Sequence, residues 1–155
     1  MADQTTETEE PPRLTDEEML ARFQNSKKRP PCSETLDMRL ESVDQANMAI
    51  TMSFEAKKDF TNPMGSVQGG FVGAMLDEAI ATCGIIASNV TMTMPTLEIK
   101  ISYLRPLFPG RALAKAWIIR LGKTVAFIEA ELYGEDGKMV AKASSTVAPK
   151  PFKRF

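Results

Sequence analysis

The sequence predicts a single α+β domain in which one antiparallel sheet wraps a long, buried helix. Small and aliphatic residues fill the segment 69–87 and leave it almost no polar face, which is typical of a core helix. The segments on both sides of it alternate apolar and polar residues, which indicates strands. With 155 residues, 43% of them hydrophobic, the chain is long enough to bury a core without disulfides.

The first 31 residues are predicted to precede the main domain. Residues 1–13 read as a disordered acidic tail that ends at Pro11-Pro12, because nothing in it offsets the entropy of ordering. Residues 14–31 are predicted to form a helix and a linker. Thr15 and Glu18 suggest a capping box that opens a helix over about 15–25, and a basic, proline-containing break at 27–31 ends it.

The main domain, residues 32–155, is predicted to open with a hairpin between Glu34 and Glu55. Leu36, Met38 and Leu40 alternate with polar residues, as do the even-numbered positions from 48 to 54, and a turn is expected near 44–47. A loop over 56–68 leads to the helix at 69–87. Pro, Gly and turn residues then separate four further strands, at about 92–104, 111–121, 124–134 and 138–147.

Composition excludes several classes of partner. The net charge is −1 and no basic stripe interleaved with aromatic residues occurs, so nucleic acid is not expected. A membrane is not expected either, because the polar start resembles no signal or transit peptide and the longest apolar run contains Asp77 and Glu78. Cys32 and Cys83 lack metal-ligand spacing and are too few for a disulfide framework, so we expect no metal and a reducing, cytoplasmic location.

The absence of histidine restricts the chemistry further. The chain contains no His, which rules out Ser–His–Asp and Cys–His catalysis, imidazole acid–base chemistry and His metal sites. Any catalysis must therefore use carboxylates, Lys, Tyr, Cys or backbone dipoles. Cys83 lies inside the apolar helix and is interpreted as a small buried hydrophobe.

The most informative stretch is 62–78, where a polar, Gly-rich turn runs into the apolar helix. A carboxylate in such a helix must be paired, hydrogen-bonded or functional. Asp77 is the leading candidate, and Glu78, about 100° round the helix, is its rival. Gly69 and Gly70 at the helix start can offer backbone N–H groups to an oxyanion. Asp77 lies eight residues further on, about 12 Å along the helix, so one chain cannot complete the site.

Three blocks of sequence resemble a known family. They are Asn62…Gly65…Gln68-Gly69-Gly70…Asp77, the segment 96–106 (TLEIKISYLRP) and the segment 121–127 (LGKTVAF). In this order they look like the hotdog-fold acyl-CoA thioesterases of the phenylacetate-pathway and thioesterase-superfamily-member-2 branch. The resemblance covers about residues 34–148. It departs from the family at Gln68, where His usually precedes the two glycines.

The resemblance implies a fold, an activity and an assembly. The fold would be a hotdog, and the activity would be hydrolysis of an acyl- or aryl-CoA thioester to the free acid and coenzyme A, without a cofactor. A homodimer, paired into a dimer of dimers, would bring Gly69 of one subunit opposite Asp77 of the other.

It also implies roles for individual residues. Asp77 would act as general base or as nucleophile, Thr96 would position the water, and the Gly69 N–H would polarise the carbonyl. Asn62 would orient the carboxylate or the water, with a loop-capping role as the equal alternative. Gln68 would hold the carbonyl or the loop.

Coenzyme A would contact the start of the long helix and a later hairpin. The expected residues are Gly70 and, around the turn at 121–122, Arg120, Gly122 and Lys123. For the two charged residues, solvated hairpin charges are the equal alternative. A hotdog protein that binds an acyl-CoA or aryl ligand without hydrolysing it is the other function considered, since Gln68 replaces the usual His. A dehydratase fits less well, because its usual dyad needs His.

Overall fold

The computed structural model describes residues 12–152, so the predicted tail at 1–13 falls almost wholly outside the described residues. Its helices are α1 (Asp16–Gln24), α2 (Pro31–Thr35), the short 3₁₀ helix η1 (Lys58–Phe60) and α3 (Gly69–Ala87). Its strands are β1 (Arg39–Asp44), β2 (Ala49–Ala56), β3 (Met92–Thr93), β4 (Thr96–Tyr103), β5 (Gly110–Leu121), β6 (Ala126–Tyr133), β7 (Met139–Val147) and β8 (Lys150–Pro151).

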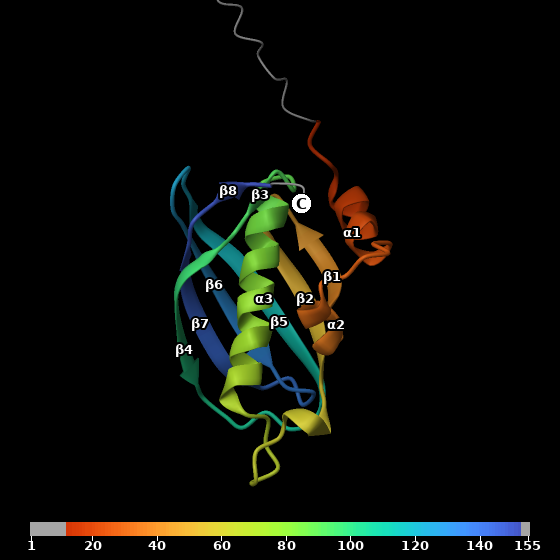
Figure 1. Cartoon of the computed structure of the whole chain (residues 1–155), viewed down its shortest axis with the longest axis vertical. Helices are drawn as coiled ribbons and strands as arrows, with labels where there is room; N and C mark the ends of the chain where they lie inside the picture. The colour runs from red at the N-terminus through yellow and green to blue at the C-terminus, as the bar shows by residue number, and fades with distance from the viewer. Residues whose placement is uncertain (1–11, 153–155) are drawn as a thin grey trace, which may run out of the picture.

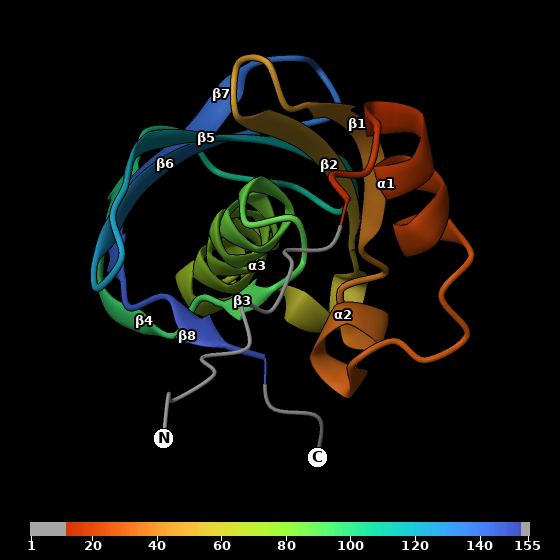
Figure 2. The same cartoon turned by 90° about the horizontal axis from the view of Figure 1, so that it is seen from above.

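Six strands form one antiparallel sheet in the order β1-β2-β5-β6-β7-β4. The sheet curves around α3, which runs along its concave face (Figure 1). Seen from above, the helix sits inside the curve while α1 and α2 lie beside β1 and β2 (Figure 2). The predicted α+β class is therefore confirmed, with one long central helix and a short N-terminal helix.

The long helix α3 has the predicted bounds and two different faces. Its inner side buries seven apolar residues against the sheet, and each Val, Leu, Ile or Met side chain among them contributes about 1.5–3 kcal/mol of transfer free energy. They are Val72, Met75, Leu76, Ala79, Ile80, Cys83 and Ile86. The opposite side stays exposed or half-buried and carries three small residues, one isoleucine and two carboxylates: Gly70, Ala74, Ala81, Ile85, Asp77 and Glu78. We call this second side the open face of α3.

By length and composition alone, α3 could also cross a membrane. Half of its most apolar stretch is buried inside the fold. A helix in the core of a folded domain passes the same test. The two carboxylates on its open face and the sheet around it fit a core helix, as the sequence predicts.

The N-terminal arm, residues 12–38, confirms one prediction and corrects another. Thr15 and Glu18 form the expected capping box at the start of α1. The first strand, however, does not begin near Glu34. Pro31 starts the short helix α2, because proline is favoured in the first turn of a helix, where its missing N–H costs nothing. Leu36, the first residue of the apolar–polar alternation that suggested a strand, is therefore the C-cap of α2. The strand β1 begins only at Arg39.

The segment predicted as one strand over 92–104 is two strands. It breaks at Met94-Pro95, between β3 and β4, and β3 pairs with β8 instead of joining the main sheet. Proline cannot donate to a strand ladder. Met94 turns inward at this break and packs on α3, where a Cβ at Gly84 would lie only 2.6 Å from the Met94 Cγ. Glycine at position 84 therefore permits the close approach.

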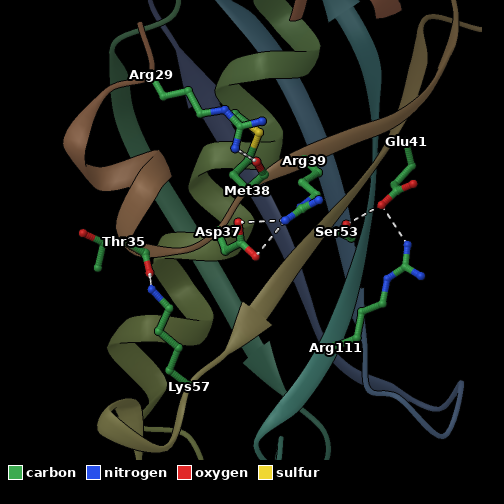
Figure 3. Close-up of polar contacts among 9 residues, drawn as sticks. All are labelled: Arg29, Thr35, Asp37, Met38, Arg39, Glu41, Ser53, Lys57 and Arg111. Carbon is green, nitrogen blue, oxygen red and sulfur yellow. Dashed lines mark hydrogen bonds and ion pairs between the residues drawn. The ribbon is translucent and has the colours of Figure 1, made fainter. Parts of the chain in front are cut away.

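The two edges of the main sheet differ. Near β1, two side chains of the N-terminal arm donate to carbonyls: Gln24 Nε2 lies 3.1 Å from the oxygen of Leu40 in the strand, and Arg29 Nη1 lies 3.1 Å from the oxygen of Met38 just before it. Figure 3 shows the second of these contacts beside the bond from Lys57 to the Thr35 carbonyl, which fixes the end of α2. At the other edge, β4 has β7 as its sole strand neighbour within residues 12–152.

Candidate active site

The start of α3 presents one free backbone donor. Gln68 is the N-cap, and its Oε1 accepts a hydrogen bond from the Gly70 N–H at 2.7 Å. The Gly70 N–H is therefore already used, whereas the Gly69 N–H has no hydrogen-bond partner among residues 12–152. The helix dipole adds positive potential at this end. The NH₂ group of the exposed Gln68 side chain has no hydrogen-bond partner among residues 12–152, so it remains available as a donor.

Tyr103 holds this helix start against the edge strand. Its hydroxyl donates to the Gly69 carbonyl at 2.9 Å, and a Cβ at Gly69 would lie 3.3 Å from its ring. One turn along, a Cβ at Gly73 would lie 3.1 Å from the Ile101 Cδ1. The glycines thus let β4 approach α3 closely. Tyr103 lies in one of the blocks that indicate the family, but no local pattern assigned it a contact with Gly69.

The middle of α3 holds the two carboxylates, and they point to different partners. Asp77 is half-buried, and its Oδ1 accepts a 2.8 Å hydrogen bond from the hydroxyl of Thr96, the first residue of β4. Glu78 Oε1 instead accepts a 2.6 Å hydrogen bond from Ser33 of α2. The structure thus brings together Asp77 and Thr96, as expected from the resemblance. Sequence reasoning missed Ser33, because it lies at the start of the main domain, just before the predicted hairpin, where no local pattern assigned it an element or a partner.

The other predicted residues lie apart from this pair. Asn62 stabilises its own turn, since its Nδ2 lies 3.0 Å from the Ser66 Oγ and its Oδ1 accepts the Met64 N–H at 2.9 Å. Within one chain it takes the loop-capping role that was the alternative.

Arg120, Gly122 and Lys123 lie in and next to the turn between β5 and β6, at the end of the sheet near the C-terminus of α3 (Figure 1). The two charged residues are exposed. A Cβ at Gly122 would lie 2.5 Å from the Val125 carbonyl oxygen, so the turn requires glycine there. The start of α3 lies at the other end of the helix, so one chain does not gather these residues with Gly69.

One chain therefore contains two separate parts of a possible site. Gly69 offers a hydrogen-bond donor at the first turn of α3, and the Asp77–Thr96 pair offers a carboxylate and a hydroxyl two turns further along. At 1.5 Å per residue the two lie about 12 Å apart along the helix axis. A thioester carbonyl cannot contact both within the same chain.

Comparison with known proteins decides the family. Residues 64–141, half of the chain, match the family model described as thioesterase superfamily. The chain belongs to the thioesterase superfamily. A protein of Saccharolobus solfataricus that is named as a candidate esterase is 30% identical to this chain over 110 residues, which are 70% of this chain and 75% of the relative. A medium/long-chain acyl-CoA thioesterase of Salmonella typhimurium is 24% identical over 132 residues, covering 75% and 83% of the two chains.

Solved structures agree with the superfamily fold. A phenylacetic acid degradation-related protein of Ralstonia eutropha superposes on this chain with a TM-score of 0.78 and 31% identity, over 84% of this chain and 98% of that one. The Escherichia coli PaaI protein, from a phenylacetic acid degradation operon, gives a TM-score of 0.70 at 21% identity, over 84% and 88%. The hotdog fold and the resemblance to the phenylacetate-related thioesterases are thereby confirmed.

Proposed function

We propose that the protein is an acyl-CoA thioesterase that hydrolyses an acyl- or aryl-CoA to the free acid and coenzyme A. The observation that carries this proposal is the Asp77–Thr96 hydrogen bond, which joins a carboxylate on the core helix to a hydroxyl on the edge strand. An acyl-CoA thioesterase among the relatives supports the substrate class. The reaction uses water and no cofactor, and two free cysteines fit a reducing, cytoplasmic location.

The site is completed by a second copy of the chain. A two-fold dimer with the α3 helices side by side places the Gly69 N–H of one subunit opposite Asp77 of the other. Two features support this arrangement. The open face of α3 carries Gly70, Ala74 and Ala81, whose small side chains allow a second helix to approach closely. The edge strand β4 exposes Leu97 and Tyr103 by 62% and 55%, and its outer side is free to pair.

The chemistry then needs few groups. The Gly69 N–H, and the NH₂ of Gln68 beside it, stabilise negative charge on the thioester oxygen. Asp77 takes a proton from a water held by Thr96, and that water attacks the carbonyl carbon. In the alternative route, the Asp77 carboxylate attacks first, and water hydrolyses the resulting anhydride. Both routes expel coenzyme A as a thiolate. A thiol has a pKa of about 8.5, so its departure requires no strong general acid, which suits a chain without His.

Three further groups complete the proposed contacts. Asn62, from the subunit that supplies Gly69, orients the water or the carboxylate across the interface. Arg120 and Lys123, next to and in the β5–β6 turn, meet the coenzyme A phosphates, and Gly122 permits the tight turn between them. Gly70 contributes backbone surface at the helix start, because its own N–H is already bonded to Gln68.

A direct assay tests the activity. Purified protein is incubated with short, medium, long and aryl acyl-CoAs, and the released thiol is measured with a thiol reagent. Release from at least one class is expected. Tight binding without release from any of them would instead favour the non-catalytic ligand-binding protein that the Gln68 substitution allows.

Complementation tests the shared site. An Asp77→Asn chain and a Gly69→Pro chain are each expected to be nearly inactive. When the two are unfolded together in equal amounts and refolded, half of the dimers contain one chain of each kind. Each mixed dimer has one intact site, so about a quarter of the wild-type activity should return. A site formed within one chain would recover nothing.

A further inference from the structure

Tyr103 is a polar residue at the start of α3 to which the proposed function gives no chemical role. It lies at the end of β4, beside the first turn of the helix (Figure 1), and its hydroxyl donates to the Gly69 carbonyl at 2.9 Å. Its side chain covers that turn, since a Cβ at Gly69 would lie 3.3 Å from the ring and one at Gly73 would lie 3.8 Å from the hydroxyl. More than half of the residue is exposed, so burial alone does not account for this bond.

The bond from Tyr103 begins a series of linked amide groups. The Gly69 carbonyl belongs to the same peptide unit as the Gly70 N–H, which donates to Gln68 Oε1 at 2.7 Å. That oxygen belongs in turn to the side-chain amide of Gln68, whose NH₂ has no hydrogen-bond partner among residues 12–152. The hydroxyl, the peptide unit and the side-chain amide are thus joined in one direction, each donating to the next. We call these three groups the Tyr103–Gln68 series.

The direction of the series favours donation from the Gln68 NH₂. An amide is a resonance system, so a hydrogen bond accepted at its oxygen draws electron density from its nitrogen and makes its N–H a stronger donor. Bonds linked in this way strengthen one another by about 10–30% each. The same bonds restrict the exposed Gln68 side chain, which would otherwise sample several rotamers. The amide is therefore polarised and fixed before a substrate arrives.

From this geometry we infer that Tyr103 is a positioning residue of the thioesterase reaction, which acts through the Gln68 amide and makes its NH₂ an effective donor to the thioester oxygen. The inference rests on the proposed function, in which this NH₂ and the Gly69 N–H stabilise the developing negative charge. Donors that are oriented before the charge forms stabilise it without a cost of reorganisation. A phenylalanine at position 103 would fill the same space, but the series would lose its first donor.

A purely structural role for Tyr103 makes different predictions. A bond that only tied β4 to α3 would contribute to the free energy of unfolding, and its loss would act independently of Gln68. A positioning role changes kcat and not KM, because the negative charge on the oxygen exists only in the transition state. It also requires the Gln68 amide, so the effects of changing the two residues are not additive.

The test is a double-mutant cycle, measured with the acyl-CoA that the wild type hydrolyses fastest. Tyr103→Phe should lower kcat by about 3- to 10-fold and change KM by less than about 2-fold, because its effect cannot exceed the ~10-fold expected for loss of the Gln68 amide. The second background is Gln68→Ser, which keeps an oxygen to cap the Gly70 N–H and lacks the NH₂. In that background Tyr103→Phe should lower kcat by less than about 2-fold.

Tyr133→Phe is the matched control, because the chain has two tyrosines and each makes a hydrogen bond through its hydroxyl. The Tyr133 hydroxyl donates to Glu131 at 2.6 Å. Tyr133 alternates along β6 with the buried residues that face α3, so its side chain lies on the other side of the sheet from the site. Its replacement should leave kcat and KM unchanged in both backgrounds.

The outcomes separate this inference from the proposed function. A wild type that hydrolyses no acyl-CoA removes both. Equal losses of kcat from Tyr103→Phe in the two backgrounds, or a change confined to KM or to thermal unfolding, keep the proposed function and overturn the inference alone. If Tyr103→Phe does not fold, a ring-fluorinated tyrosine incorporated into the Tyr133→Phe protein alters position 103 alone. Its more acidic phenol is a stronger donor and should raise kcat below neutral pH, and an unchanged kcat would overturn the inference as well.

Discussion

The Thr96 hydroxyl donates to Asp77 Oδ1 at 2.8 Å, and this bond joins the first residue of the edge strand β4 to the middle of the core helix. It occupies one carboxylate oxygen. The other, Oδ2, has no partner in the described chain and remains available to a water molecule. Glu78, the next residue, turns toward α2 and bonds to Ser33 instead. Adjacent carboxylates on one helix thus have separate surroundings.

Asp77→Asn should lower kcat/KM by about 10²–10⁴-fold, the range for loss of a positioned acid–base group. The substitution keeps the side-chain shape and the oxygen that accepts from Thr96, so thermal unfolding should change little. Glu78→Gln should lower kcat/KM for octanoyl-CoA by less than about 10-fold, or ~1.4 kcal/mol. Steady-state kinetics on both variants check this, and losses in the opposite order would move the catalytic role to Glu78.

Gly69→Pro should reduce kcat by about 10²–10³-fold, because it removes the one N–H proposed to stabilise the oxyanion. The helix should survive, since proline suits the first helical position and Gln68, with φ −64° and ψ 139°, has the backbone that a following proline requires. Gly69→Ala is the matched control, because it adds the same Cβ near Tyr103 and keeps the N–H. Equal losses in the two variants would attribute the effect to crowding of Tyr103.

Gln68→Ala should lower kcat by no more than about 10-fold if the Gly69 N–H supplies most of the carbonyl polarisation. It should also cost about 0.5–2 kcal/mol of unfolding free energy, because the side chain caps α3. Gln68→His should remain active and add a pH dependence near pH 6–7, where imidazole titrates and the parent has no His. Rate–pH profiles of the three proteins test this. If Gln68→Ala were as inactive as Asp77→Asn, the amide would be a main oxyanion donor.

One thiol per chain should react with an aromatic disulfide reagent in the folded protein, and two after unfolding. Cys32 is exposed, whereas burial raises the pKa of the Cys83 thiol to about 12 and leaves it protonated near neutral pH. Cys32→Ser should therefore abolish the fast reaction. Rapid modification of Cys83 in that variant would mean that α3 opens from the sheet in the native state.

Local sequence patterns correctly predicted the helices whose start, apolar run and caps all lie within one continuous segment of the chain. The glycine-rich start and the apolar run gave α3 its bounds, and the Thr15–Glu18 capping box gave α1. Two signals misled the assignment. The alternation beginning at Leu36 overlapped a helix started by Pro31, and Pro95 divided a run that otherwise reads as one strand.

The candidate site shows the same limit. The resemblance indicated Asp77 and Thr96 together, but the Glu78–Ser33 bond joins residues 45 positions apart and the Tyr103–Gly69 bond joins residues 34 apart. Such contacts depend on how the arm and the edge strand pack on α3, and the hydrophobic periodicity of the sequence does not predict them. A serine in a proline-rich segment carries no sign of a buried partner until that segment lies against the helix.

The unequal edges of the sheet limit how copies of the chain can assemble through it. At the β1 edge, Gln24 bonds the Leu40 carbonyl and Arg29 bonds the Met38 carbonyl just before the strand, whereas no strand pairs with the outer side of β4 within residues 12–152. A protein with two unpaired sheet edges could form open-ended fibres, because each added subunit would again present a free edge strand. With one edge closed, pairing through strands uses β4 of each partner and consumes the last free edge, so growth stops at two chains. We therefore expect the N-terminal arm to disfavour open-ended association through the β1 edge.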